Sequence, residues 1–308
     1  MSSLFEVSDT WMVISIYLTP SSIASLSCTC SEANTVINHP VVWEQQCARF
    51  YHTEPDNTDS PQVIDYKDRI RKFIEKYGPH CIWYYHRVRR CWTALQKWSE
   101  EHLPELLDTF NPPATDQQIA DFKKTLFGDE GHESLTAYLL FLGECANGQR
   151  FDAQYPTMGL FGFYSFNNKR STGRLLSTED ATRFTEQVHS LYANDFDSVN
   201  RRHDATSSNH GLNPKLKNLW LYTAGLPTAD GQISIPCLTL LDRVSGRIFK
   251  ILQNCTCWHP GHGNATSFLD HLEWYINNTF FKYNMFKHIW FNQSKFCHFL
   301  YIIRMHRI

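Results

Sequence analysis

The chain has 308 residues, of which 42% are hydrophobic and 19% are charged. This composition excludes a disordered or low-complexity protein, and the length predicts two folded units rather than one. The 29 basic and 31 acidic residues give a formal net charge of −2. A balance of this kind predicts no general electrostatic attraction to nucleic acid or to an anionic membrane.

The sequence indicates a cytoplasmic or nuclear protein. The apolar run from Trp11 to Leu18 follows Glu6 and Asp9, where a secretory signal would carry basic residues. No segment reaches the roughly 20 apolar residues of a membrane helix. The ten cysteines are scattered, so we expect buried thiols rather than a disulfide framework.

Residues 1–52 predict a compact run of four short helices. Proline favours the first position of a helix and disfavours helical geometry in the residue before it, so Pro20 begins the second helix and Pro40 limits the third. The four helices are expected over residues 9–18, 20–27, 31–38 and 41–51.

The first of these helices has more apolar surface than its own unit can cover. Seven of the eight residues from Trp11 to Leu18 are apolar, which is typical of a helix buried on every side. A unit of about fifty residues buries only about 60% of its unfolded surface. The spare face therefore packs against the second unit or against a partner protein, and the periodicity does not distinguish the two.

The residue order of this first unit resembles the F-box family. The spacing from Leu18 to Trp43 and the closing pair Phe50-Tyr51 carry the resemblance, together with Val7, Met12, Val13, Ile14, Tyr17, Ile23, Leu26, Cys30, Val36, His39, Pro40, Val41, Val42 and Cys47. Glu6-Val7 stand where the family has Leu-Pro. The resemblance implies that a Skp-type adaptor, and through it a cullin, is the partner of the spare face.

The resemblance also implies which residues bind that adaptor. They are expected to face solvent in the free protein, and they are Val7, Met12, Val13 and Ile23. By contrast, Leu18 and Trp43 are expected to pack inside the unit.

A helical connector is expected over residues 53–84, with a helical stretch that stops at Gly78-Pro79, before a second unit over residues 85–284. Four helices are predicted in this second unit. The first runs from Val88 to Leu103, the second follows a capping box at Thr115 and Gln118, the third covers residues 134–146, and the last runs from about 266 to 283. The basic side chains of Arg87, Arg89 and Arg90 are expected on a solvated helix face.

The later part of the second unit reads as strands. They are predicted over residues 160–166, 219–222, 233–241 and 247–252, with a hairpin turn at residues 242–246. Helices followed by strands and a last helix predict an α+β fold, with a mainly antiparallel sheet flanked by helices.

This order of elements resembles the SUKH (Smi/Knr-type) domain over residues 85–284. The motifs are a Trp-containing first helix, a helix ending in Asn147-Gly148-Gln149, the run from Gly159 to Gly162, and the hairpin at Gly246. An F-box followed by this domain resembles the F-box only protein three type. That type continues into an ApaG-type β domain, so we expect residues 285–308 to be a tail, as a truncated or alternative end.

The target-binding surface of the second unit is expected where a helix end meets a strand. The residues at that place are Asn147, Gly148, Gln149, Arg150, Gly159, Leu160, Phe161 and Gly162.

The Cys- and His-rich run near residue 257 has the ligand types of a zinc site, in Cys255, Cys257, His259 and His262. Four ligands within eight residues are too close together for an ordinary structural zinc site, so we expect a loop and no metal or other cofactor. No nucleophile elbow or phosphate-binding loop is present, and Cys28 and Cys30 are expected to pack in the helical core. The sequence therefore predicts no catalytic residues.

Three functions remain open at this point. The resemblance implies a substrate-recognition adaptor of an SCF-type (Skp-cullin-F-box) E3 ubiquitin ligase, which binds a target protein through the SUKH-like domain. The alternative is a non-catalytic regulatory interaction protein with a decayed F-box. A metal-dependent enzyme built on the Cys and His run is the third.

Overall fold

The structure is a computed structural model of the whole chain. It describes residues 18, 20–29, 31–51, 65–128, 131–151, 159–161, 173–193, 215–225, 237–252, 255–260 and 267–277. The predicted first helix, apart from Leu18, lies outside the described residues, as do residues 53–64 of the expected connector and the tail at 285–308.

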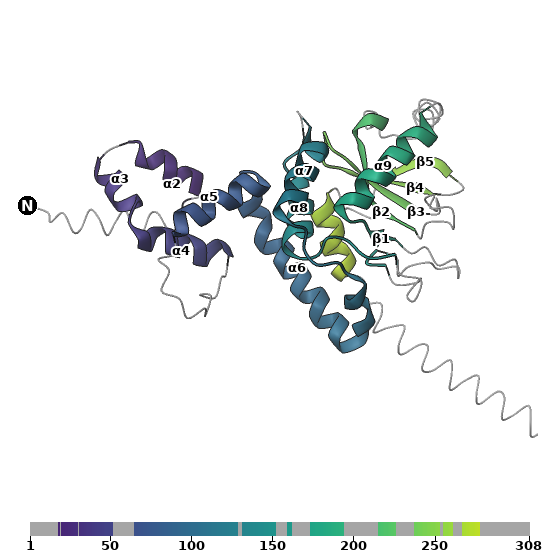
Figure 1. Cartoon of the computed structure of the whole chain (residues 1–308), viewed down its shortest axis with the longest axis horizontal. Helices are drawn as coiled ribbons and strands as arrows, with labels where there is room; N and C mark the ends of the chain where they lie inside the picture. Colours follow the sequence, from purple (N-terminus) through teal and green to yellow (C-terminus); the bar gives the residue numbers. More distant parts are fainter. Residues whose placement is uncertain are drawn as a thin grey trace, which may run out of the picture.

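Three short helices form the described part of the N-terminal unit: α2 (Pro20–Ser27), α3 (Ser31–Ile37) and α4 (Pro40–Tyr51). Proline occupies the first position of both α2 and α4, where a backbone N–H would have no partner within the helix. The predicted second, third and fourth helices are confirmed, and they lie at one end of the molecule (Figure 1).

Two helices connect this unit to the rest of the chain. Helix α5 (Tyr66–Tyr77) begins at Asp65, whose side chain accepts a hydrogen bond from the Asp68 N–H, and ends at Gly78. Helix α6 (Cys81–His102) follows at once and begins earlier than predicted. The boundary expected between residues 84 and 85 therefore lies inside α6, and this helix is continuous across it.

The helical layer of the second unit contains η1 (Pro104–Thr109), α7 (Asp116–Phe127) and α8 (Leu135–Glu144). The predicted capping box before α7 is confirmed, because Thr115 and Gln118 each bond to the other's backbone N–H. Helix α8 is buried on every side from Leu135 to Gly143. It packs against α5, α6 and α7.

A five-stranded antiparallel sheet stands beside these helices (Figure 1). Its order follows the sequence: β1 (Arg174–Leu175), β2 (Leu219–Ala224), β3 (Cys237–Asp242), β4 (Ile248–Leu252) and β5 (Cys255–Pro260). In the predicted hairpin, Leu241 pairs with Ile248. The α+β class with an antiparallel sheet is thus confirmed.

An aromatic cluster joins the helices to the sheet. Every residue of β2 is buried, so both faces of this strand are covered. Tyr138 of α8 lies 6.0 Å from Tyr222 of β2 and 5.0 Å from Phe268, measured between ring centroids. Phe268 opens the last helix, residues 268–277, whose residues Leu272 and Tyr275 are also buried.

Two expectations about the second unit were wrong, and one helix was not predicted. Leu160 and Phe161 form a turn rather than the start of a strand, and residues 162–166 lie outside the described part. A loop was expected where β5 forms, because Cys and His are not strong strand formers. The unpredicted helix is α9 (Thr178–Tyr192), which packs on β2 and is capped by Ser177.

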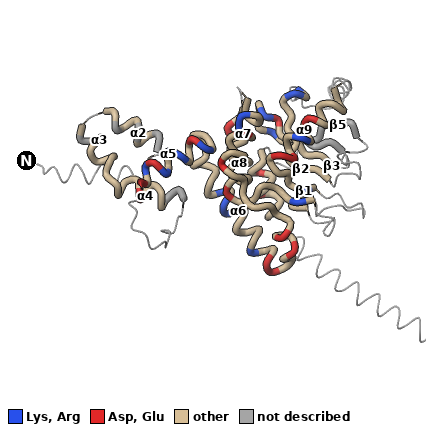
Figure 2. The backbone as a smooth tube through the Cα atoms, in the orientation of Figure 1, with Lys and Arg blue, Asp and Glu red and all other residues tan. Residues whose placement is uncertain are grey.

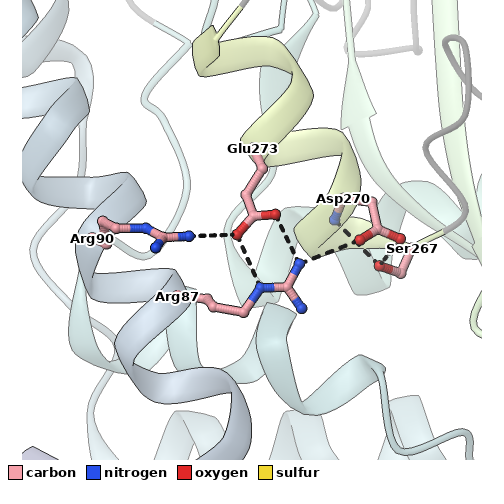
Figure 3. A network of polar contacts seen from close by, with 5 residues as sticks. All are labelled: Arg87, Arg90, Ser267, Asp270 and Glu273. Carbon is pink, nitrogen blue, oxygen red and sulfur yellow. Dashed lines mark hydrogen bonds and ion pairs between the residues drawn. The ribbon is translucent and has the colours of Figure 1, made fainter.

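The expected solvated face of α6 is instead a site of ion pairing with the last helix (Figure 3). Arg87 binds Glu273 in a bidentate manner, with distances of 2.9 Å from Nε to Oε1 and 2.7 Å from Nη2 to Oε2. Arg90 reaches the same carboxylate at 3.3 Å, and Asp270 lies 3.4 Å from Arg87. The hydrogen bond from Arg87 holds the pKa of Glu273 below its ordinary value.

We predict that Glu273→Gln lowers the free energy of unfolding at pH 7, because it removes the ion pair with Arg87. The expected loss is only about 1 kcal/mol, because this ion pair is partly exposed to solvent. The folded-state pKa of Glu273 is depressed. Its contribution is therefore complete above the unfolded pKa, near 4.5, and is lost as the pH falls through the folded value. Urea unfolding at pH 7 and pH 3 measures this. Glu100→Gln, at an exposed position on α6, is the control, and an equal effect of Glu273→Gln at both pH values contradicts the prediction.

Candidate functional site

The residues predicted to bind a target are mostly inside the protein. Gln149 and Leu160 are fully buried, Asn147 is 8% exposed, and Gly148 and Gly159 are buried. Of the described residues in this set, Arg150 is exposed and Phe161 half-buried, while Gly162 lies outside the described part. The buried members cannot form a target-binding surface, and for them this expectation was wrong.

These residues instead join the helical layer to the sheet. The Gln149 side chain donates to Thr109 Oγ1 at 2.7 Å and accepts from the Leu160 N–H at 2.7 Å and the Leu175 N–H at 3.3 Å. Its own backbone N–H donates to the Leu175 carbonyl at 2.8 Å. The buried amide of Gln149 thus forms hydrogen bonds with the end of η1, the turn at residue 160 and the edge strand β1.

The residues expected to bind the adaptor divide into two groups. Val7, Met12 and Val13 lie outside the described residues. Ile23 is fully buried, in the same hydrophobic core as Trp43, so the expectation that Ile23 faces solvent was wrong. Helix α2 contributes this side chain to the folding of its own unit.

The Cys and His run that we considered for zinc lies at the sheet edge. Cys255, Cys257 and His259 belong to β5, but their side chains, and all of His262, lie outside the described part. Among the side chains that the structure describes, no group of three or more Cys, His, Asp or Glu residues could hold a metal ion.

Four described cysteines are buried, as expected: Cys47, Cys81, Cys91 and Cys145. Burial raises the pKa of the Cys81, Cys91 and Cys145 thiols to about 12, which keeps them protonated and unreactive. Cys28 is exposed, so the expectation that it packs in the helical core was wrong.

A groove of about 1040 Å³ lies between α5 and α7 and is also lined by residues from the start of α6 and the end of α8. The sequence patterns did not predict this groove. It is lined by Arg69, Lys72, Phe73, Glu75, Lys76, Tyr85, Asp116, Ala120, Lys123, Lys124, Phe127, Gly128 and Glu144. These residues include no Ser, Cys or His, so the arrangement suits non-covalent binding rather than nucleophilic catalysis.

The floor of this α5–α7 groove is aromatic. Phe73 and Tyr85 meet edge to face, with ring centroids 5.4 Å apart, and Phe127 adds a half-buried ring from α7. Behind them the Tyr77 hydroxyl donates to Glu144 Oε1 at 2.5 Å. The resulting surface offers apolar contact with a fixed shape.

The rim of the groove is basic. Lys76 lies 2.7 Å from Asp116 and 3.6 Å from Glu144, and so compensates two carboxylates. Lys123 donates to the backbone carbonyl of Glu75 at 2.9 Å, and burial lowers the pKa of its ammonium group. Within the described residues, neither Lys123 nor Arg69 forms an ion pair with a carboxylate. Figure 2 shows the charged residues interspersed along both helices.

One sequence signal could have revealed this groove. Basic residues recur on the segment Lys67–Lys76 and again at Lys123-Lys124, and both segments are predicted helices. That these two helices contact each other in the fold is a non-local fact, which periodicity does not encode.

No family model matches the chain, and no curated protein matches it. In the described part of the chain, every helix is too short or too polar to cross a bilayer.

We predict that Gly148→Ala costs at least about 2 kcal/mol more stability than Gly78→Ala. Both glycines have positive φ, +70° and +96°, so both variants are strained. A Cβ at Gly148 would lie 2.3 Å from the Ser177 nitrogen, whereas a Cβ at Gly78 would have no other heavy atom within 4 Å. Urea unfolding of the two variants tests this, and equal losses would contradict it.

We predict that Ile23→Ala lowers the free energy of unfolding by about 2–4 kcal/mol, because it removes buried methyl groups and leaves a cavity. Gln45→Ala, at an exposed position on α4, should change it by less than about 0.5 kcal/mol. If thermal and urea unfolding give equal stability for the two variants, Ile23 is not a core residue.

Proposed function

We propose that the chain is the substrate-recognition adaptor of an SCF-type E3 ubiquitin ligase. In this proposal the N-terminal helices act as an F-box that binds a Skp-type adaptor, and the SUKH-like domain holds a target protein. The chain itself is non-catalytic, because ubiquitin transfer is performed by other subunits. Residues 285–308 would take no part.

The observation that carries this proposal is the form of the N-terminal unit. Three short helices lie in the segment whose residue order resembles an F-box, and Trp43, which the resemblance expects to pack internally, is buried. Helix α4 then packs directly on α5 and α6. A ligase subunit needs this kind of attachment, since the adaptor-binding and target-binding parts must keep a defined separation.

A non-catalytic regulatory interaction protein with a decayed F-box is the second candidate. It is favoured by Glu6-Val7, which stand where the family has Leu-Pro. The two candidates differ in one property, which is binding to the Skp-type adaptor.

We predict that the full chain co-purifies with a Skp-type adaptor and that Met12→Asp weakens this binding at least 100-fold. An unpaired carboxylate buried in the interface costs several kcal/mol, and micromolar binding corresponds to only about 8 kcal/mol. Isothermal titration measures the change. Thr93→Asp, at an exposed position on α6, is the matched control and should bind normally.

Circular dichroism must show that the variant is folded, and Val7→Asp serves as the second variant if Met12→Asp is not. Adaptor binding that survives both changes contradicts the assignment of this face. Failure of the unaltered chain to bind the adaptor contradicts the ligase function and favours the regulatory candidate.

A further inference from the structure

We propose that the α5–α7 groove binds a segment of the target protein in which acidic side chains flank an aromatic or aliphatic residue. This inference rests on the proposed function for the identity of the partner as a ubiquitination target. The groove itself is defined by the described residues alone.

Charge is the first argument. Five cationic and three anionic side chains line the groove, which leaves a surplus of two positive charges on a chain whose formal net charge is −2. One lysine, Lys76, compensates both Asp116 and Glu144. Lys72 and Lys124 pair with carboxylates outside the groove lining, Asp68 at 2.7 Å and Asp121 at 3.8 Å. Arg69 and Lys123 are the lining cations that form no ion pair within the described residues, and their charge favours an anionic occupant.

Lys123 is the strongest single feature. Its ammonium group is partly desolvated, and it donates a hydrogen bond to a neutral group, the backbone carbonyl of Glu75. Desolvation disfavours the charged form of a lysine, and a carboxylate at hydrogen-bond distance would reverse this effect. Arg69 stands on the facing helix and presents a guanidinium group, which suits bidentate binding of a carboxylate.

The floor argues for a peptide rather than a small anion. Phe73, Tyr85 and Phe127 offer aromatic surface beneath the cations, and such surface gains nothing from inorganic phosphate. An aromatic or aliphatic side chain seated there would bury apolar area. The volume of about 1040 Å³ is at the upper limit of small-molecule pockets, and it has room for several residues of extended chain.

The carboxylates among the lining residues argue against nucleic acid. Glu75, Asp116 and Glu144 are three of the eight charged side chains that line the groove, and they would repel a continuous phosphate backbone. A nucleic-acid site needs a basic stripe with few carboxylates, since each phosphate contact is electrostatic. A segment with alternating acidic and apolar side chains can avoid these three carboxylates.

The test uses the full chain and fluorescence anisotropy with a labelled peptide of ten residues, in which Asp and Glu flank one Phe and one Leu. A second peptide has Asn and Gln in place of the acids, and a third has Ser in place of Phe and Leu. We expect the first to bind at least tenfold more tightly than either of the others. Raising the salt from 0.05 M to 0.5 M should weaken its binding, because screening shortens the reach of the cations.

Charge reversal locates the site. Arg69→Glu combined with Lys123→Glu should weaken binding of the first peptide at least tenfold. The control combines Lys97→Glu with Lys217→Glu, which makes the same change of net charge at exposed positions outside the groove, and it should stay within twofold. If loss of the Lys123 hydrogen bond unfolds the first variant, Arg69→Glu with Lys124→Glu replaces it.

Equal binding of the acidic and amide peptides overturns the proposal, as does binding that survives charge reversal in the groove. Competition by inorganic phosphate or by a single-stranded RNA at a lower concentration than the unlabelled peptide also overturns it, in favour of a phosphate site. These outcomes are separate from adaptor binding, which tests the ligase function: the groove can fail while the adaptor binds, and the reverse.

Discussion

A single buried amide, that of Gln149, sets how the helical layer meets the sheet. A fully buried polar side chain is costly unless its hydrogen-bonding capacity is used, and Gln149 serves Thr109, Leu160 and Leu175 together. The turn before it, at Gly148, brings α8 close to the start of α9, with no room for a Cβ. The orientation of α8, and hence of the groove wall that ends at Glu144, depends on this junction.

The basic side chains of the helical layer have two different roles. Arg87 and Arg90 are used internally, because they hold the last helix against α6 through Glu273. Arg69 and Lys123, on α5 and α7, have no carboxylate partner within the described residues. The same residue types thus stabilise the fold at one face of the helical layer and leave positive charge available at another. The difference lies in which helix packs opposite them.

Local patterns predicted much of the fold. Pro20 and Pro40, the capping box at Thr115 and the turn before Gly246 are local signals, and the elements they predict are present. Non-local facts were not accessible. Ile23 looks like a surface residue in the sequence but is fully buried in the folded chain, and Asn147 to Gln149 look like an exposed helix end until β1 pairs there. The α5–α7 groove belongs to the same class, since it is formed by segments about fifty residues apart.

Helix α6 has a mechanical consequence. Its 22 residues extend about 33 Å without interruption, and they contact both α4 and α8. A torque applied to the N-terminal unit is therefore transmitted along a stiff rod instead of being absorbed by a hinge. A protein that binds α4 therefore also fixes the orientation of the second unit.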